Sequence, residues 1–308
     1  MLVLVVIAIW AVRNLDAHAL VAAIHQSNWR LLLLAMGANV TVLALQAWRW
    51  KVLLTALAPV SYLEVVSALI VGVTTSSLVP ARAGEVVRVH LIARKMNVRR
   101  ASVAGTALLD HIVNGVSIVP LLAALPFLGE IPTWMQRSLF VVLVVVCGGA
   151  VLAWFTADAS EEPRVHQNAW MQFLARVRHG LRGVRSLKRM GQAASISVVA
   201  WIGEVAVILL SIHAFDPHYG VGVAILALVS INIAIAVPSP PGNFGTLELG
   251  VVLVVVAFGM QREQAIALAL AYHVVQLVSV WLLCLPAMWW LRRSEVPAFD
   301  GSMRRELP

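Results

Sequence analysis

Two strongly apolar runs are separated by Val237-Pro238-Ser239-Pro240-Pro241-Gly242-Asn243-Phe244-Gly245-Thr246-Leu247-Glu248. Three prolines and two glycines in this stretch cannot propagate a helix, so the backbone must open here. Open backbone at membrane depth is tolerated where it lies inside a helical bundle or lines a cavity. We therefore predict a functional site at this break, with a loop at the membrane surface as the alternative. The hinge positions expected here are Pro238, Pro241, Gly242 and Gly245.

A second break lies nearer the N-terminus, at Leu78-Val79-Pro80-Ala81-Arg82-Ala83-Gly84-Glu85. Both breaks close on a glutamate, and Asp110 follows Glu85 by the same 25 positions that separate His273 from Glu248. Each half then has a short apolar helix, a polar turn and a long apolar helix. This order indicates an internal duplication. The repeats are expected at 1–128 and 136–291, and the hinges of the first break at Pro80 and Gly84.

The composition is that of an integral membrane protein. Hydrophobic residues make up 60% of the chain and charged residues 12%, with a mean hydropathy of +0.87. A net charge of +8 then favours cytoplasmic loops and anionic lipid over nucleic acid as its explanation. Cys147 and Cys284 lie in apolar runs and indicate neither a disulfide nor a metal site. No cofactor, metal or catalytic group is expected.

Apolar runs divide the chain into full spans and shorter arms. The arms beside each break are too short to cross a bilayer alone, so we predict two re-entrant helical hairpins in an all-α polytopic protein. The transmembrane domain is expected at 1–291, with a cytoplasmic amphipathic basic segment at 157–192 and a disordered cytoplasmic tail at 292–308. Predicted spans are Leu31–Leu54, Ala101–Leu128, Leu139–Phe155, Ala193–Phe215 and Ala265–Trp290, and predicted arms are Tyr62–Val79, Glu85–Ala93, Val221–Val237 and Leu249–Phe258; the region 13–30 is expected to be a polar connection.

The distribution of Lys and Arg predicts the orientation. We expect the protein in the inner membrane with both termini in the cytoplasm. In this topology 17 Lys and Arg residues lie on the cytoplasmic side and 4 on the outer side. Trp48-Arg49-Trp50-Lys51 is expected to anchor a helix end at the cytoplasmic interface. In this topology the two hairpins enter from opposite sides, so the repeats are inverted, as in many transporters.

These motifs resemble those of the lysylphosphatidylglycerol synthase transmembrane-region family, whose members are often called flippase-like and some of which are associated with hopanoid synthesis. The resemblance rests on Pro80-x-Arg82-x-Gly84-Glu85-x-x-Arg88, on Trp48-Arg49-Trp50-Lys51 and on Pro241-Gly242-x-x-Gly245-x-x-Glu248. It implies an inner-membrane protein that binds or translocates a lipid.

The chain departs from the family pattern at two places. Asp110-His111 stands where many members carry Glu-Arg, and His273 with Gln276 stands where many carry Arg. The substrate is therefore expected to differ. The soluble aminoacyltransferase domain of the lysine-attaching members is not expected here, so the synthase name implies no activity for this chain.

The two breaks carry the candidate site residues with the clearest roles. Glu85 and Glu248 can cap the half-helices that follow the breaks, or couple transport to protons or cations. Arg88 lies three positions after Glu85, a spacing that predicts an ion pair. Arg82, in the opened turn, is the favoured contact for a phosphate because a guanidinium offers two parallel hydrogen bonds.

Polar residues in the long helices extend this candidate substrate-binding set. Asp110, His111 and Asn114 form a one-turn cluster, and His273 and Gln276 stand at the corresponding place in the second repeat. They either hydrogen-bond between helices or form a polar track for a headgroup or proton.

We expect this protein to bind and translocate an anionic lipid or a polyprenyl-phosphate-linked lipid. One alternative is an intramembrane enzyme that modifies a lipid headgroup, with Glu85, Asp110 and His111 as acid/base groups. Another is a scaffold for a lipid-synthesis complex. The expected partners are the bilayer, the lipid substrate and, for a scaffold, lipid-synthesis enzymes.

Overall fold

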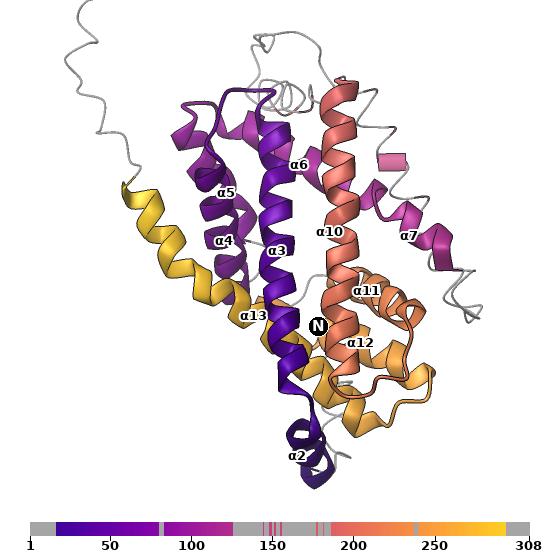
Figure 1. The fold of residues 1–308 in the computed structure, drawn as a ribbon. Helices are drawn as coiled ribbons and strands as arrows, with labels where there is room; N and C mark the ends of the chain where they lie inside the picture. The colour runs from indigo at the N-terminus through magenta and orange to yellow at the C-terminus, as the bar shows by residue number, and fades with distance from the viewer. Residues whose placement is uncertain are drawn as a thin grey trace, which may run out of the picture.

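The computed structural model describes residues 17–79, 83–125, 186–236 and 240–293, together with a few isolated positions between 144 and 181. The elements in these residues are all helices, so the all-α prediction is confirmed for this part of the chain (Figure 1). They are α2 Ala17–Gln26, α3 Trp29–Leu54, α4 Tyr62–Leu78, α5 Ala83–Lys95, α6 Arg100–Val116, α7 Val119–Ala124, α10 Leu187–His213, α11 Val221–Ala236, the 3-10 turn η3 Pro241–Asn243, α12 Thr246–Ala257 and α13 Arg262–Arg293.

Four described helical stretches are long and apolar enough to cross a membrane: α3, α6 with α7, α10 and α13. Helices α3 and α10 pack along each other, and α13 runs obliquely past them (Figure 1). Large apolar side chains on these helices face outward, such as Leu285 at 77% exposure and Ile202 at 58%. Because exposing such an apolar surface to water is unfavourable, it indicates contact with lipid. The protein is a membrane protein.

Several predicted boundaries need correction. The long helix expected at Ala101–Leu128 is interrupted between Val116 and Val119, and Pro120 lies in the first turn of α7. Proline lacks the N–H that an uninterrupted helix would need at that position. The region 13–30, expected to be a polar connection with modest helical periodicity, contains helix α2, in agreement with that periodicity.

The basic segment and the tail also have different limits. Residues 187–192, assigned to the segment at 157–192, form the first turns of α10. Arg292 and Arg293, assigned to the tail at 292–308, end α13. The remainder of both regions, and nearly all of the span predicted at Leu139–Phe155, lie outside the described residues.

Helices α4 and α5 pack tightly because glycines remove side chains from their contact. A Cβ added to Gly84 would collide with the carbonyl oxygen of Gly72. Helices α11 and α12 pack in the same manner at Gly250, where an added Cβ would lie 2.7 Å from the Cα of Ile231. Each predicted hairpin therefore consists of two helices in close backbone contact.

The two helix pairs approach each other inside the molecule. The turn η3 contacts α4, and a Cβ on Gly242 would lie 3.3 Å from the carbonyl oxygen of Ser77. Gly242 and Gly245, predicted as hinges, have φ values of +68° and +83°, which favour glycine. Figure 1 shows the α4–α5 pair in the upper part of the bundle and the α11–α12 pair in the lower part. The predicted hinges Pro80 and Pro238 lie outside the described residues.

Basic residues gather at one end of the bundle. Lys51 and Lys188 line one cavity there, and Nζ of Lys95 donates to the carbonyl oxygen of Leu291, 3.2 Å away. At the opposite end the α2–α3 connection meets the α10–α11 connection, where the N–H of Asn28 donates to the carbonyl of Ala214 at 2.8 Å. Lys51, Lys95 and Lys188 thus lie toward one end of the bundle, and the side of the membrane that this end faces stays a prediction.

Candidate functional site

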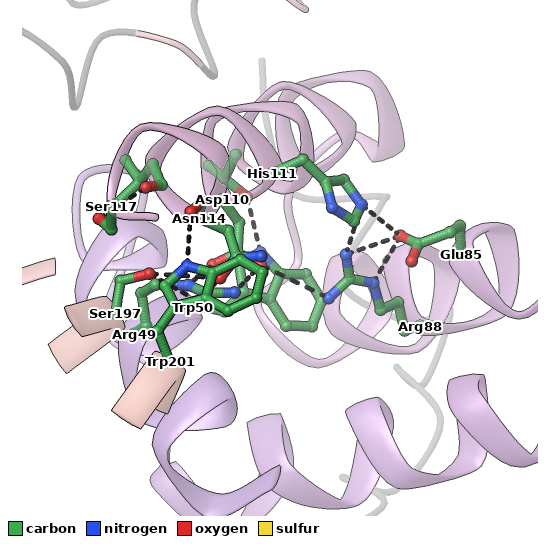
Figure 2. A network of polar contacts seen from close by, with 12 residues as sticks. Arg49, Trp50, Glu85, Arg88, Asp110, His111, Asn114, Ser117, Ser197 and Trp201 are labelled. Atoms are coloured by element: carbon green, nitrogen blue, oxygen red, sulfur yellow. Dashed lines mark hydrogen bonds and ion pairs between the residues drawn. The ribbon is translucent and has the colours of Figure 1, made fainter. Parts of the chain in front are cut away.

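A buried arginine joins three long helices inside the bundle. Nε and Nη2 of Arg49 on α3 donate to the two carboxylate oxygens of Asp110 on α6, at 2.7 and 3.2 Å. Nη1 donates to Oδ1 of Asn114 at 2.6 Å and to Oγ of Ser197 on α10 at 3.1 Å (Figure 2). Nearly all of the donor capacity of this guanidinium is therefore used, and its position is fixed.

A second arginine continues the network toward α5. Nη2 and Nε of Arg88 lie 2.6 and 2.7 Å from Oε2 of Glu85, so the ion pair predicted from their spacing is confirmed. Nη2 also lies 3.3 Å from Nε2 of His111, and Nη1 lies 4.0 Å from Oδ2 of Asp110. The guanidinium stacks 4.5 Å from the ring centre of Trp50 (Figure 2).

Helical geometry divides the polar residues of α6 between these two arginines. Asp110 and Asn114 are four positions apart, so both face Arg49. His111 is one position further round the helix and faces Arg88. The backbone carbonyl of Asn114 also accepts a 2.8 Å hydrogen bond from the indole of Trp201 on α10. The predicted polar cluster thus has two parts. Asp110 and Asn114 hydrogen-bond to Arg49 and connect α6 to α3, while His111 contacts Arg88 of α5.

Burial determines which part of this network an outside molecule can reach. The side chains of Arg49, Arg88 and Asp110 are 3 to 6% exposed, whereas Glu85 is 39% and His111 is 53% exposed. Two guanidinium groups and two carboxylates balance in formal charge, which a low-dielectric interior requires. An incoming group would therefore meet Glu85 and His111 first, with Arg88 directly behind them.

The second half of the chain has a smaller polar cluster, around Glu248 and His273. Oε1 of Glu248 lies 2.6 Å from Nδ1 of His273, and Oε2 accepts a 2.7 Å hydrogen bond from the N–H of Gly245. Glu248 therefore caps α12, as one of its two expected roles required, and it also contacts α13. Gln276 donates to the hydroxyl of Tyr272 at 2.8 Å and does not contact Glu248 in the described structure.

Trp281 links α13 to α4 close to η3. The indole N–H of Trp281 on α13 donates to Oγ of Ser77 near the end of α4, at 3.1 Å. The side chain of Phe244, just after η3, stacks 4.5 Å from the ring of His273. Ser77 of α4 and Phe244 after η3 therefore both contact α13.

Two expectations about single residues were wrong. Arg49 and Trp50, predicted to anchor a helix end at the membrane interface, are 4% and 0% exposed. Arg49 lies on the same face of α3 as the buried Val42, seven positions earlier, and so points into the bundle. Ser197 was missed as well, although a hydroxyl inside an apolar span marks a possible hydrogen-bond partner.

Glu204 is an acidic residue inside the α10 span. Its Oε1 accepts a 3.2 Å hydrogen bond from Gln46 on α3, and it forms no ion pair with a described residue. Arg82, the predicted phosphate contact, lies outside the described residues.

No group of three described His, Cys, Asp or Glu residues lies close enough together to hold a metal ion. At the connection between α10 and α11, Nδ1 of His218 lies 2.7 Å from Oδ1 of Asp216. A hydrogen bond from the backbone N–H of His218 holds the pKa of Asp216 below its usual value. This exposed pair is a solvated turn.

Comparison with known proteins identifies the family that the chain matches. Residues 1–284 match the family described as the lysylphosphatidylglycerol synthase TM region. A UPF0104 membrane protein of Methanocaldococcus jannaschii is 20% identical to the chain over 210 residues, which cover 67% of this chain and 89% of that protein. No solved structure matches the chain.

Proposed function

Because this chain belongs to the lysylphosphatidylglycerol synthase transmembrane-region family, we propose that it binds an anionic lipid and moves it across the membrane. A polyprenyl-phosphate-linked lipid has the same charge and falls within the proposal. The observation that carries it is Arg88, a buried guanidinium whose described ion-pair partner on the accessible side is the half-exposed Glu85. Ionisable groups inside a membrane bundle mark substrate or ion pathways.

The proposed mechanism is an exchange of anions on Arg88. In the structure the Glu85 carboxylate occupies the guanidinium fork, and a lipid phosphate would replace it with two similar hydrogen bonds. Glu85 would keep His111, whose Nε2 is 3.4 Å from Oε2, as its partner.

Alternating access would arise from the two helix pairs acting as re-entrant hairpins of inverted repeats. The contact between η3 and α4 supports this, since it lets a movement of one pair act directly on the other. Further support comes from the equal sequence offsets of Glu85 to Asp110 and Glu248 to His273. The basic end of the bundle, which includes Lys51 and Lys188, would lie on the cytoplasmic side of the inner membrane.

We propose no catalytic step. The enzyme alternative needs Asp110 as a free acid or base, but Arg49 holds both of its carboxylate oxygens and leaves it 2% exposed. Glu85 and His111 remain accessible but contact Arg88, an arrangement suited to binding. A scaffold would require no such ionisable groups inside the membrane.

The test is reconstitution of the pure protein into vesicles that contain trace dye-labelled lipids. Labelled phosphatidylglycerol and labelled phosphatidylcholine are compared for movement between leaflets with a membrane-impermeant quencher. Mass spectrometry of the same vesicles then detects any chemical change. The proposal expects faster movement of the anionic lipid with no new lipid mass. A new lipid mass would support the enzyme, and equal rates for both lipids would refute selectivity for an anion.

A further inference from the structure

A second candidate site lies at the basic end of the bundle, away from the Arg88 network. A cavity of about 440 Å³ opens between the C-terminal end of α3 and the N-terminal end of α10. Its volume is within the range of small-molecule sites. The residues that give it chemical character are Lys51, Thr55, Ser186, Lys188, Arg189 and, at its edge, Trp48.

No acidic side chain among the described residues compensates the charge of this cavity. Lys51, Lys188 and Arg189 line it together, and no acidic residue is among the described lining residues. None of the three forms an ion pair with a described carboxylate, in contrast to Arg49 and Arg88, which are both neutralised. Three cations held around one concavity raise the local potential for an anion.

The start of α10 adds hydrogen-bond donors to this positive field. Oγ of Ser186 caps the helix by accepting from the N–H of Arg189 at 3.4 Å. The other N–H groups of the first turn have no acceptor within the helix. Together with the hydroxyl groups of Thr55 and Ser186, they suit a group with several acceptor oxygens, such as a phosphate.

The position of the cavity matches the depth of lipid headgroups. It lies where two spanning helices end, and Trp48 at its edge is 47% exposed. Tryptophan favours this interface because its ring is amphipathic. Basic pockets between spanning helices on the cytoplasmic side are suited to anionic headgroups.

We propose that this cavity binds a phosphate ester, and that its position selects an anionic phospholipid of the adjoining leaflet as the source. The phosphate would lie among Lys51, Lys188 and Arg189, with the acyl chains against the outer faces of α3 and α10. This lipid is a resident of the cavity. It shares no contact residue with the proposed transport site, so binding here can be measured without any transport assay.

The test is lipid retention by the delipidated full-length protein, measured by native mass spectrometry. Phosphatidylglycerol, phosphatidylcholine and inorganic phosphate are the probes. Removing two charges with Lys188→Gln and Arg189→Gln should weaken binding of phosphatidylglycerol by about thirtyfold. The control is Arg99→Gln with Arg100→Gln, which removes two exposed charges that do not line the cavity. Lys51→Gln, on α3, is a second cavity variant that removes a charge without altering the start of α10, so loss of binding there cannot come from misfolding of that helix end.

The proposal expects tight retention of phosphatidylglycerol by the wild type and the control pair, and loss in both cavity variants. Binding of inorganic phosphate that shows the same dependence on these charges, and that displaces the lipid, would support the site and assign it to a soluble ligand. Equal loss of phosphatidylglycerol in the control pair, or equal retention of phosphatidylcholine by the wild type, would overturn the proposal.

Discussion

Arg49 and Asp110 form a two-pronged ion pair in the interior, with Nε to Oδ1 at 2.7 Å and Nη2 to Oδ2 at 3.2 Å. The pair joins α3 to α6 and leaves neither charge available to a ligand. Arg88, behind the accessible Glu85, is therefore the guanidinium that can exchange partners. The fixed pair and the exchangeable pair lie next to each other, with Arg88 Nη1 4.0 Å from Asp110.

The fixed pair should be structural. Arg49→Met leaves the buried carboxylate of Asp110 without its cation and should lower the free energy of unfolding by about 3–5 kcal/mol. The double change Arg49→Met with Asp110→Leu removes both charges and should recover much of that loss. Thermal unfolding of the detergent-solubilised proteins measures both effects. A double variant no more stable than the single one would argue against the pair as the cause.

Close packing of α4 and α5 depends on Gly84. Gly84→Ala should sharply lower the unfolding temperature, because its Cβ would overlap the backbone carbonyl of Gly72. Gly37→Ala on α3 is the matched control, since nothing lies within 4 Å of its Cβ position. Alanine there should be neutral or stabilising by up to about 1 kcal/mol. Equal stability of the two variants would disprove the close contact.

Two substitutions should separate the capping role of Glu248 from the role of its charge. Glu248→Gln can still accept the N–H of Gly245 and should unfold close to the wild-type temperature. Glu248→Ala loses the cap as well, which costs about 1 kcal/mol more. Both should reduce lipid movement, because both lose the charged contact with His273. Wild-type transport by Glu248→Gln would limit this residue to capping.

Topology can be tested by labelling. In a background without Cys147 and Cys284, single cysteines at Ser61 and Gln261 occupy exposed positions before α4 and before α13. An impermeant thiol reagent should reach the first from the cytoplasm and the second from outside. Labelling of both from the same side would end the inverted-repeat interpretation.

Sequence patterns predicted the parts of the site that depend on local spacing. The Glu85–Arg88 pair follows from three positions on a helix. The contact of Glu248 with His273 was not predicted as a contact, although the repeat register placed His273 opposite Asp110. Register alone gives equivalent positions, and only the packing of α12 on α13 brings the two side chains together.

The parts that depend on long-range packing were not predictable. Arg49 stands between two tryptophans and before Lys51, a pattern typical of a membrane interface. Its burial depends on two distant partners. Asp110, 61 positions away, neutralises its guanidinium, and Ser197, 148 positions away, accepts a hydrogen bond from it. Glu204 likewise hydrogen-bonds to Gln46 across 158 positions rather than to an arginine. No local pattern specifies such partners.

The most direct test of the central claim is movement of labelled phosphatidylglycerol by Arg88→Lys in reconstituted vesicles. Lysine keeps the positive charge but loses the two-pronged geometry, so the rate should fall by about tenfold or more. Arg99→Lys, at an exposed position, is the control and should transport as the wild type does. A wild-type rate for Arg88→Lys, at equal abundance and unfolding temperature, would contradict the proposal that Arg88 binds the lipid phosphate.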